Sequence, residues 1–209
     1  MPEIIAPMDI EKRSFEIITQ ILGDRAFDKE NESVIKRVIH TTADFDFADT
    51  LCFSEHAVRK GIEALQGGCD IVTDTQMAKA GINKNILASL GGEVHCFMSD
   101  PDVAEEAKLR GVTRAIVSME KAAQLTKKCI YAIGNAPTAL IKLRELIDED
   151  RLHNAALIIA VPVGFVNVEE SKELIIHSGF PYIAARGRKG GSPVAAAVCN
   201  AMLYQIKRV

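Results

Sequence analysis

From about residue 70 to the C-terminus, the chain alternates short apolar runs with longer segments of helical periodicity. The runs are rich in Ile, Val, Leu and Ala, which is typical of strands buried on both faces. They comprise residues 71–73, 94–97, 130–133, 157–161 and 182–185. Strands joined by helices pair in parallel and need helices on both faces of the sheet. The sequence therefore predicts an α/β fold, a three-layer α/β/α arrangement with a mostly parallel sheet.

Two helices are predicted ahead of this alternation. Asp9 is an expected N-cap, and an apolar stripe at helical spacing follows it. A second apolar face over residues 34–39 predicts a helix that ends near His40. No internal repeat, low-complexity stretch or long linker divides the chain, and 209 residues can bury a core without staples. The expected organisation is a single domain over residues 1–209.

Composition and charge exclude several classes of protein. Lys and Arg number 25 against 28 Asp and Glu, so no basic excess supports binding to nucleic acid or to an anionic membrane. The five cysteines form no C-x-x-C pair, which disfavours a disulfide framework and a zinc site and suits a cytoplasmic protein. The N-terminus does not resemble a signal peptide, and the apolar run over 155–166 is too short to span a bilayer. A soluble enzyme or small-molecule binder is predicted.

Three expected strand ends run into glycine and then into a helix start, where free N–H groups can hold an anion. These loops are 134–138, 164–167 and 186–192, and each could also be an ordinary tight turn. The last loop carries three cations and three glycines, and Gly190 and Gly191 are expected to let its backbone approach a ligand. The chain has no P-loop and no early G-x-G-x-x-G. A ligand with several negative charges, other than a nucleotide, is therefore favoured.

Among the single polar residues, Asp74 and His40 allow more than one interpretation. Asp74 could be an acid, a metal ligand or a helix cap, and capping is favoured because no ligand partner stands at a suitable spacing. Ser54 and Ser192 are also expected to cap helices. His40 follows Arg37 by three residues, so both lie on one helix face. His40 could bond the last carbonyls of its helix, or move a proton while Arg37 holds an anionic substrate.

Several motifs, in order and with compatible spacing, resemble the precorrin-8X methylmutase (precorrin isomerase) family over nearly the whole chain. They are RVIHTTADF at 37–45, the segment 74–82, AIGNAPTAL at 132–140, VPVGFV at 161–166 with EESK at 169–172, and RGRKGGS at 186–192. The resemblance implies a homodimeric α/β isomerase without an organic cofactor or metal. Such an enzyme moves a methyl group from carbon 11 to carbon 12 of a corrin precursor in cobalamin biosynthesis, giving cobyrinate or hydrogenobyrinate.

The resemblance also assigns roles to individual residues. The family's catalytic histidine falls on His40, and its substrate-contacting positions near the N-terminus fall on Ser14 and Arg37. A Thr-Arg pair of the family is similar to residues 113–114, which implies a substrate contact for Arg114. The run over 40–45 is similar to the oxygen-independent branch of the family, whose substrate carries cobalt.

The implied chemistry suits the residues already singled out. The substrate would be a tetrapyrrole rimmed by acetates and propionates, which cations and helix N-termini can bind. The expected substrate-binding residues are Ser14, Arg37, Arg114, Asn135, Arg186 and Arg188. An intramolecular shift needs no nucleophile, hydride carrier or redox centre, and a single proton donor and acceptor at His40 is enough.

Two other functions remain open at this point. A tetrapyrrole-binding or carrier protein could use the same loops without turnover, and it should tolerate the replacement of His40. A methyltransferase would need a diffusible methyl donor, and the lack of an early glycine-rich nucleotide loop disfavours it.

Overall fold

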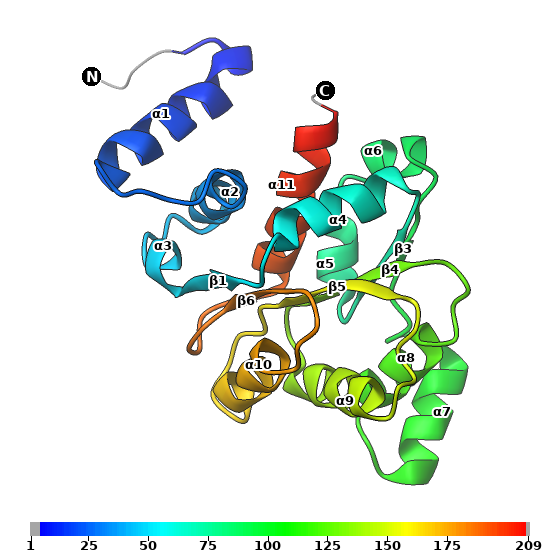
Figure 1. Ribbon diagram of the computed structural model, residues 1–209. Coiled ribbons are helices and arrows are strands. Elements are labelled where there is room, and N and C mark those ends of the chain that lie inside the picture. The colour runs from blue at the N-terminus through cyan, green and yellow to red at the C-terminus, as the bar shows by residue number, and fades with distance from the viewer. Residues whose placement is uncertain (1–4, 208–209) are drawn as a thin grey trace.

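A single sheet with the strand order β1-β6-β5-β4-β2-β3 forms the centre of the computed structural model, which describes residues 5–207 (Figure 1). The strands of the described chain are β1 (Leu51–Phe53), β2 (Asp70–Thr73), β3 (Val94–His95), β4 (Cys129–Ile133), β5 (Ala155–Ala160) and β6 (Tyr182–Ala185). Strand β1 pairs antiparallel with β6, and the other neighbouring pairs are parallel. The predicted mostly parallel sheet is confirmed.

Helices cover both faces of this sheet. After a short 3-10 turn, η1 (Pro7–Asp9), they are α1 (Ile10–Leu22), α2 (Glu32–Thr42), α3 (Phe47–Thr50), α4 (Ala57–Gln66), α5 (Gln76–Gly81), α6 (Lys84–Ser89), α7 (Pro101–Arg110), α8 (Arg114–Ala122), α9 (Pro137–Asp148), α10 (Val168–Ile176) and α11 (Ser192–Ile206). Helices α2, α4, α5 and α11 lie on one face, and α8, α9 and α10 lie on the other (Figure 1). The three-layer prediction is confirmed.

Strand β4 shows why the central strands are apolar throughout. Ile130 and Ala132 belong to the core on the α11 side, whereas Tyr131 and Ile133 belong to the core on the α9 side. All four side chains are fully buried, because successive residues of a strand point to opposite faces. Helix α11 is also apolar on most of its surface, because it lies against the sheet and contacts α2, α4 and α5.

Some local expectations were wrong. Strand β1 was not predicted, because it has three residues at the edge of the sheet and two of them are half-buried. The expected strand over 94–97 shortens to β3. Asp9 makes no capping bond. Ser54 accepts a hydrogen bond from the Tyr182 N–H (2.9 Å) instead of capping α4. Within residues 5–207, no helix is long and apolar enough to cross a membrane.

Candidate functional site

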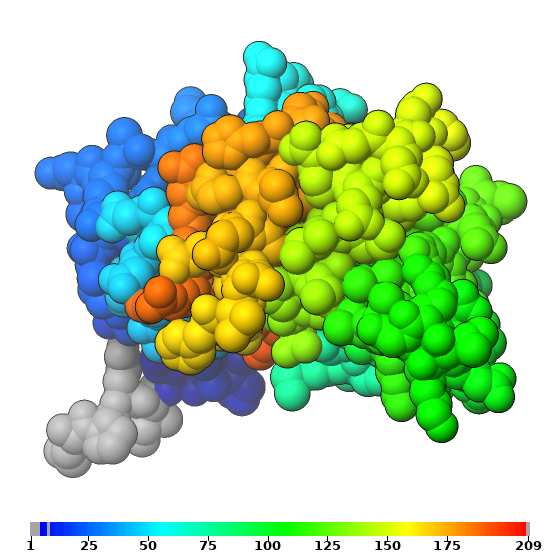
Figure 2. Space-filling view, turned by 90° about the horizontal axis from the view of Figure 1, so that it is seen from below, coloured from blue at the N-terminus to red at the C-terminus, as the bar shows by residue number. Residues whose placement is uncertain are grey.

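The loops that follow β4, β5 and β6 pack together at the carboxyl edge of the sheet. The Gly191 N–H donates to the Val161 carbonyl (2.8 Å), and the Gly164 N–H donates to the Arg188 carbonyl (3.2 Å). A Cβ on Gly134 would lie 2.8 Å from the backbone of Ser192. Figure 2 shows the loop after β5 beside the loop after β6 on one face of the molecule. The loops predicted to hold anions are therefore neighbours, at the edge where parallel sheets bind ligands.

One of these loops is already occupied by a carboxylate of the protein. Asp74, which is 1% exposed, accepts hydrogen bonds from the N–H groups of Gly134 (2.9 Å), Asn135 (2.8 Å) and Ala136 (2.6 Å). Burial raises the pKa of Asp74, and these three hydrogen bonds act in the opposite direction. The backbone of this loop is therefore not free to bind a substrate anion. The Asn135 side chain is exposed and can still do so.

The capping role predicted for Asp74 is wrong for the helix that follows it. Thr75 caps α5 instead, because its hydroxyl accepts the Ala78 N–H (3.0 Å). The same hydroxyl lies 2.7 Å from the hydroxyl of Ser192, which is the first residue of α11 rather than its N-cap. These contacts connect the ends of β2 and β6 at the edge that carries the loops.

The loop over 186–191 carries the cations that the sequence predicts. Arg186 and Arg188 are exposed and form ion pairs with Glu173 (3.6 Å) and Glu169 (2.9 Å) of α10. Exposed ion pairs of this kind contribute little stability, so both guanidinium groups can exchange these partners for a ligand carboxylate. Lys189, the third cation of the loop, forms its ion pairs with a different segment of the chain.

Lys189 ties this loop to the segment that follows α2. Its Nζ lies 2.7 Å from a carboxylate oxygen of Asp44 and 2.6 Å from one of Asp46. The hydrogen bond from Lys189 lowers the pKa of Asp44. The segment just after α2, and with it the end of the helix that carries His40, therefore lies next to the loop that carries Arg186 and Arg188.

Lys172 of α10 is fully buried beneath the same loop. Its Nζ donates to the carbonyls of Gly187 (2.7 Å) and Lys189 (2.8 Å), and burial lowers its pKa to about 8. Sequence reasoning gave Lys172 no role. The available signal was a lysine beside apolar residues in a helix, which usually indicates a side chain that reaches solvent.

The reason expected for Gly190 is wrong. A Cβ on Gly190 would collide with the Val161 carbonyl and lie 2.8 Å from the Pro162 carbonyl oxygen. Glycine is therefore required here because the loop packs against the end of β5. Gly191 has a φ of 129°, which disfavours any other residue, and its Cβ would meet no atom closer than 3.4 Å.

The N-terminal candidates gather around Phe15 of α1. The His40 ring stacks on the Phe15 ring with centroids 5.2 Å apart, and the Arg37 guanidinium lies 4.7 Å from the same ring. Arg37 also contacts the ring of Tyr204 in α11 (5.0 Å) and donates to a carboxylate oxygen of Glu11 (2.6 Å). A groove of about 1270 Å³ opens beside these aromatic rings, between α1, α2 and α11.

The environment of His40 favours one of its two interpretations. Among residues 5–207, no hydrogen bond joins its ring to the last carbonyls of α2. The hydroxyls of Thr41 and Thr42 donate to the carbonyls of Arg37 and Val38, one turn earlier in α2, at 2.9 Å and 2.8 Å. His40 is exposed, so its nitrogens can reach a ligand. The structure therefore speaks against helix capping by His40, and its role in proton transfer remains a prediction.

The seven predicted site residues form three groups. In the first group, Arg37 and His40 both contact the ring of Phe15. Ser14 precedes Phe15 in α1, and its hydroxyl donates to the Ile10 carbonyl (2.9 Å). Arg186 and Arg188 share the loop after β6. Arg114 and Asn135 lie near the starts of α8 and α9, which the hydroxyls of Thr113 and Thr138 join (2.9 Å). Within the described chain, no hydrogen bond, ion pair or ring contact joins His40 directly to the other two groups.

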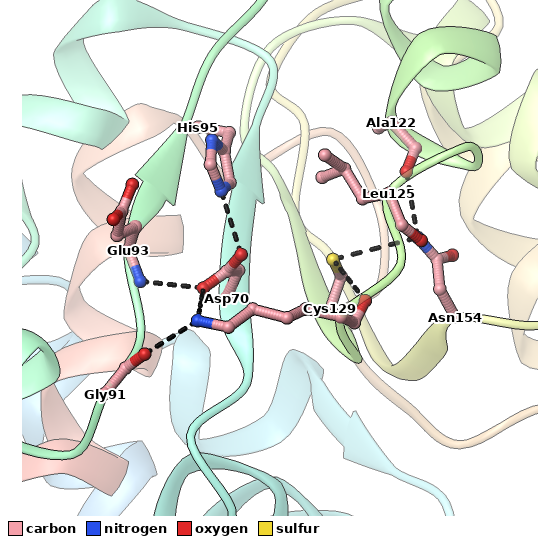
Figure 3. Close-up of polar contacts among 9 residues, drawn as sticks. Asp70, Gly91, Glu93, His95, Ala122, Leu125, Cys129 and Asn154 are labelled. Carbon is pink, nitrogen blue, oxygen red and sulfur yellow. Dashed lines mark hydrogen bonds and ion pairs between the residues drawn. The ribbon is translucent and has the colours of Figure 1, made fainter.

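A separate polar cluster lies at the amino end of β2 (Figure 3). The carboxylate of Asp70 accepts the Glu93 N–H (2.9 Å) and contacts His95 Nε2 (3.0 Å) and Lys127 Nζ (3.2 Å). Burial raises the pKa of Asp70, but the hydrogen bonds outweigh burial, and the pKa lies below its ordinary value. No group of three or more His, Cys, Asp or Glu within residues 5–207 could hold a metal ion.

This cluster predicts how stability depends on pH. Because the folded pKa of Asp70 lies below the unfolded value of about 3.9, the ionised carboxylate stabilises the fold above that value. The contribution is lost as the pH falls through the folded pKa. Asp70→Asn should lower the free energy of unfolding at neutral pH by about 1–3 kcal/mol, and the difference from wild type should shrink below about pH 4. Urea unfolding at several pH values measures it, and a difference that is constant with pH would contradict the prediction.

The fold and the cationic carboxyl edge define an α/β protein suited to a small ligand with several negative charges, with the exposed His40 at the end of the neighbouring α2. The chain belongs to the precorrin-8X methylmutase family, whose model matches residues 9–205. It is 46% identical over 215 residues to a cobalt-precorrin-8 methylmutase of Salmonella typhimurium, and the match covers 99% of each of the two chains. A second relative with that name, from Priestia megaterium, is 44% identical and covers 96% of this chain and 89% of the relative.

Solved structures give the same result. A precorrin-8x methyl mutase of Thermus thermophilus superimposes with a TM-score of 0.85 at 35% identity, covering 93% of this chain and 96% of that one. The predicted fold and family are confirmed. The roles of the individual site residues remain predictions.

Proposed function

We propose that this chain moves a methyl group from carbon 11 to carbon 12 of cobalt-precorrin-8, giving the cobyrinate skeleton during cobalamin biosynthesis. The match to methylmutases over nearly the whole chain supports this isomerisation. Two relatives named for the cobalt substrate, and the run over 40–45, support the cobalt form. The observation that carries the proposal is the exposed His40 beside Arg37, next to the cationic edge of the sheet.

In this proposal, His40 moves the proton. It donates a proton to a ring nitrogen of the macrocycle, which makes carbon 12 electron-poor through the conjugated double bonds. The methyl group then leaves carbon 11 with its bonding electrons and forms a bond to carbon 12. The ring nitrogen next to carbon 11 supplies the electron pair that carbon 11 has lost, as a new double bond. His40 takes the proton back from the nitrogen, so substrate and product have the same atoms and the same oxidation state.

The surface beside the arginines suits a macrocycle better than a small anion. The loop after β5 exposes Val163, Phe165 and Val166, and Phe165 is 85% exposed. Its ring centroid lies 5.9 Å from the guanidinium of Arg188. Clustered exposed apolar side chains commonly mark binding sites. A tetrapyrrole offers the matching combination, an apolar ring face and an edge of carboxylates.

Substrate binding should depend on Arg186. Arg186→Gln should raise the dissociation constant about 10- to 150-fold, which corresponds to the loss of about 1.5–3 kcal/mol for one charge-assisted hydrogen bond. Arg59→Gln is the matched control, since Arg59 is also half-exposed and its ion pair with Glu30 is long (3.7 Å). Absorbance titration of both variants measures the effect. Unchanged affinity in Arg186→Gln would remove Arg186 from the site.

Arg37 differs from Arg186, because its side chain is only 16% exposed and already pairs with Glu11. We infer that Arg37 binds a substrate carboxylate only by exchanging it for Glu11. Ser14, Arg114, Asn135 and Arg188 are proposed as further contacts to the substrate. Their support is the family resemblance and their position at the edge of the sheet or on α1.

A homodimer in the cytoplasm is also part of the proposal. Helix α1 exposes Ile10, Ile17 and Ile21 at helical spacing, which supports a partner on this side of the molecule. Sedimentation equilibrium tests the dimer directly.

The function itself is tested by incubating the protein with cobalt-precorrin-8 and no other reagent. The absorption spectrum should change to that of the product corrin. A carrier would bind the substrate without forming product, and a methyltransferase would form product only with an added methyl donor. Either result would replace the proposed isomerisation.

A further inference from the structure

The loop that carries Arg186 and Arg188 is held by a buried lysine. Lys172 has no exposed surface, although it belongs to one of the residue types least often buried. Its Nζ donates to two carbonyls of the loop, those of Gly187 and Lys189, at 2.7 Å and 2.8 Å. These carbonyls follow Arg186 and Arg188 in the chain, so Lys172 fixes the peptide next to each arginine.

Holding a loop in this way carries a large energetic penalty. Removing an ammonium group from water is unfavourable unless hydrogen bonds compensate, and here two backbone carbonyls provide them. At one end of the loop, the backbone of Gly190 packs so closely against β5 that a Cβ there would collide with the Val161 carbonyl. Lys172 acts on the other end of the loop, where Gly187 has a φ of 75° and would meet nothing within 4 Å. Side-chain packing therefore adds little at Gly187. The other contacts of this part of the loop include backbone hydrogen bonds of Arg186 and Arg188 and the exposed ion pairs of Lys189, and Lys172 adds the buried contacts from beneath.

The geometry points to Lys172 as a positioning residue that aligns Arg186 and Arg188 with the carboxylates of the substrate. This inference rests on the function proposed above. Lys172 itself does not touch the substrate, because it lies beneath the loop. Without its two hydrogen bonds, the loop between Arg186 and Lys189 would sample several conformations, and the arginines would meet the substrate in only a fraction of them.

The first test measures the loop without any substrate. Trypsin cleaves after Arg186, Arg188 and Lys189, so its rate of cleavage there reports how often the loop opens. Lys172→Met removes both donors and keeps the apolar stem. It should accelerate cleavage within 186–190 about tenfold or more, the effect of losing a hydrogen bond to a charged group. Lys60→Met, at an exposed lysine of α4 that forms no ion pair with any residue of 5–207, should leave that rate unchanged.

The second test measures methyl migration. Lys172→Met should raise KM about tenfold and leave kcat within about twofold, because His40 is unaffected. In a variant that already carries Arg186→Gln and Arg188→Gln, the same substitution should have little further effect on KM. Lys172→Arg, which restores donors, should recover part of the wild-type KM and of the resistance to trypsin.

The outcomes separate this inference from the proposed function. If wild type shows no methyl migration, the proposed function fails, while the trypsin result still decides whether Lys172 holds the loop. If wild type is active and Lys172→Met has normal KM, the positioning role is wrong. An equal effect of Lys172→Met with and without Arg186 and Arg188 would also overturn it. If Lys172→Met does not fold, Lys172→Arg decides: a raised KM together with faster cleavage by trypsin supports the role, and a change in only one of the two, or in neither, contradicts it.

Discussion

Replacing His40 by Asn should lower the single-turnover rate of methyl migration about 10²- to 10⁴-fold, the usual effect of losing a general acid. Asn keeps a polar side chain but cannot donate a proton to the substrate and take it back. The affinity for substrate should change little, because the arginines at the edge of the sheet bind the carboxylates. The fold should also persist, since His40 is exposed and contacts Phe15 mainly through ring stacking.

The experiment compares His40→Asn with His153→Asn, a histidine whose side chain is 74% exposed and which lies outside the site groups. Rapid mixing with cobalt-precorrin-8 gives the rate of product formation, and a titration gives the dissociation constant. A loss of rate at unchanged affinity identifies proton transfer. If His40→Asn converts substrate at nearly the wild-type rate, another group moves the proton, and the carrier function regains support.

Much of the fold could be predicted because its central strands are buried on both faces. In β4, residues of both cores alternate, so the whole strand is apolar and contrasts with the amphipathic segments around it. Strand β1 lacks this signal. Its pairing partner, β6, lies about 130 residues further along the chain, and only that long-range pairing makes residues 51–53 a strand.

The candidate site was predictable where the evidence was local. Arg37 and His40 stand three residues apart in one helix, and the structure places both against Phe15. The contact between Arg37 and Glu11 spans 26 positions, and the contact between Lys189 and Asp44 spans 145. No spacing rule links residues so far apart. Which cations are already paired is therefore a property of the tertiary structure.

Lys172 and Asp74 are two residues for which local sequence rules predict the wrong environment. Local rules place a lysine in solvent and an aspartate at the start of the next helix. In the structure both side chains are buried, and each serves a loop from another part of the sheet. An ionisable side chain is buried at each position, and both side chains bind loops at the same edge of the sheet.

The largest loss of stability is expected for Asp74→Ala. The substitution removes the acceptor for three N–H groups of the loop ahead of α9 and leaves a small cavity, since the carboxylate is 1% exposed. Hydrogen bonds to charged groups stabilise by about 1.5–3 kcal/mol each, and water can reach the exposed Asn135 in the variant. A decrease of about 3 kcal/mol in the free energy of unfolding follows, and a decrease of about 6–12 °C in Tm.

Asp74→Asn tests whether charge or shape matters. The amide keeps the size of the carboxylate but has one acceptor oxygen, and its NH₂ group would face N–H donors. It should therefore lose most of the stability that Asp74→Ala loses. Asp49→Ala, at an aspartate whose side chain is 69% exposed, should change the free energy of unfolding by less than about 1 kcal/mol. Urea unfolding at neutral pH compares the three variants. If Asp74→Ala unfolds at the same urea concentration as Asp49→Ala, the carboxylate does not hold the loop, and its backbone N–H groups become available to the substrate.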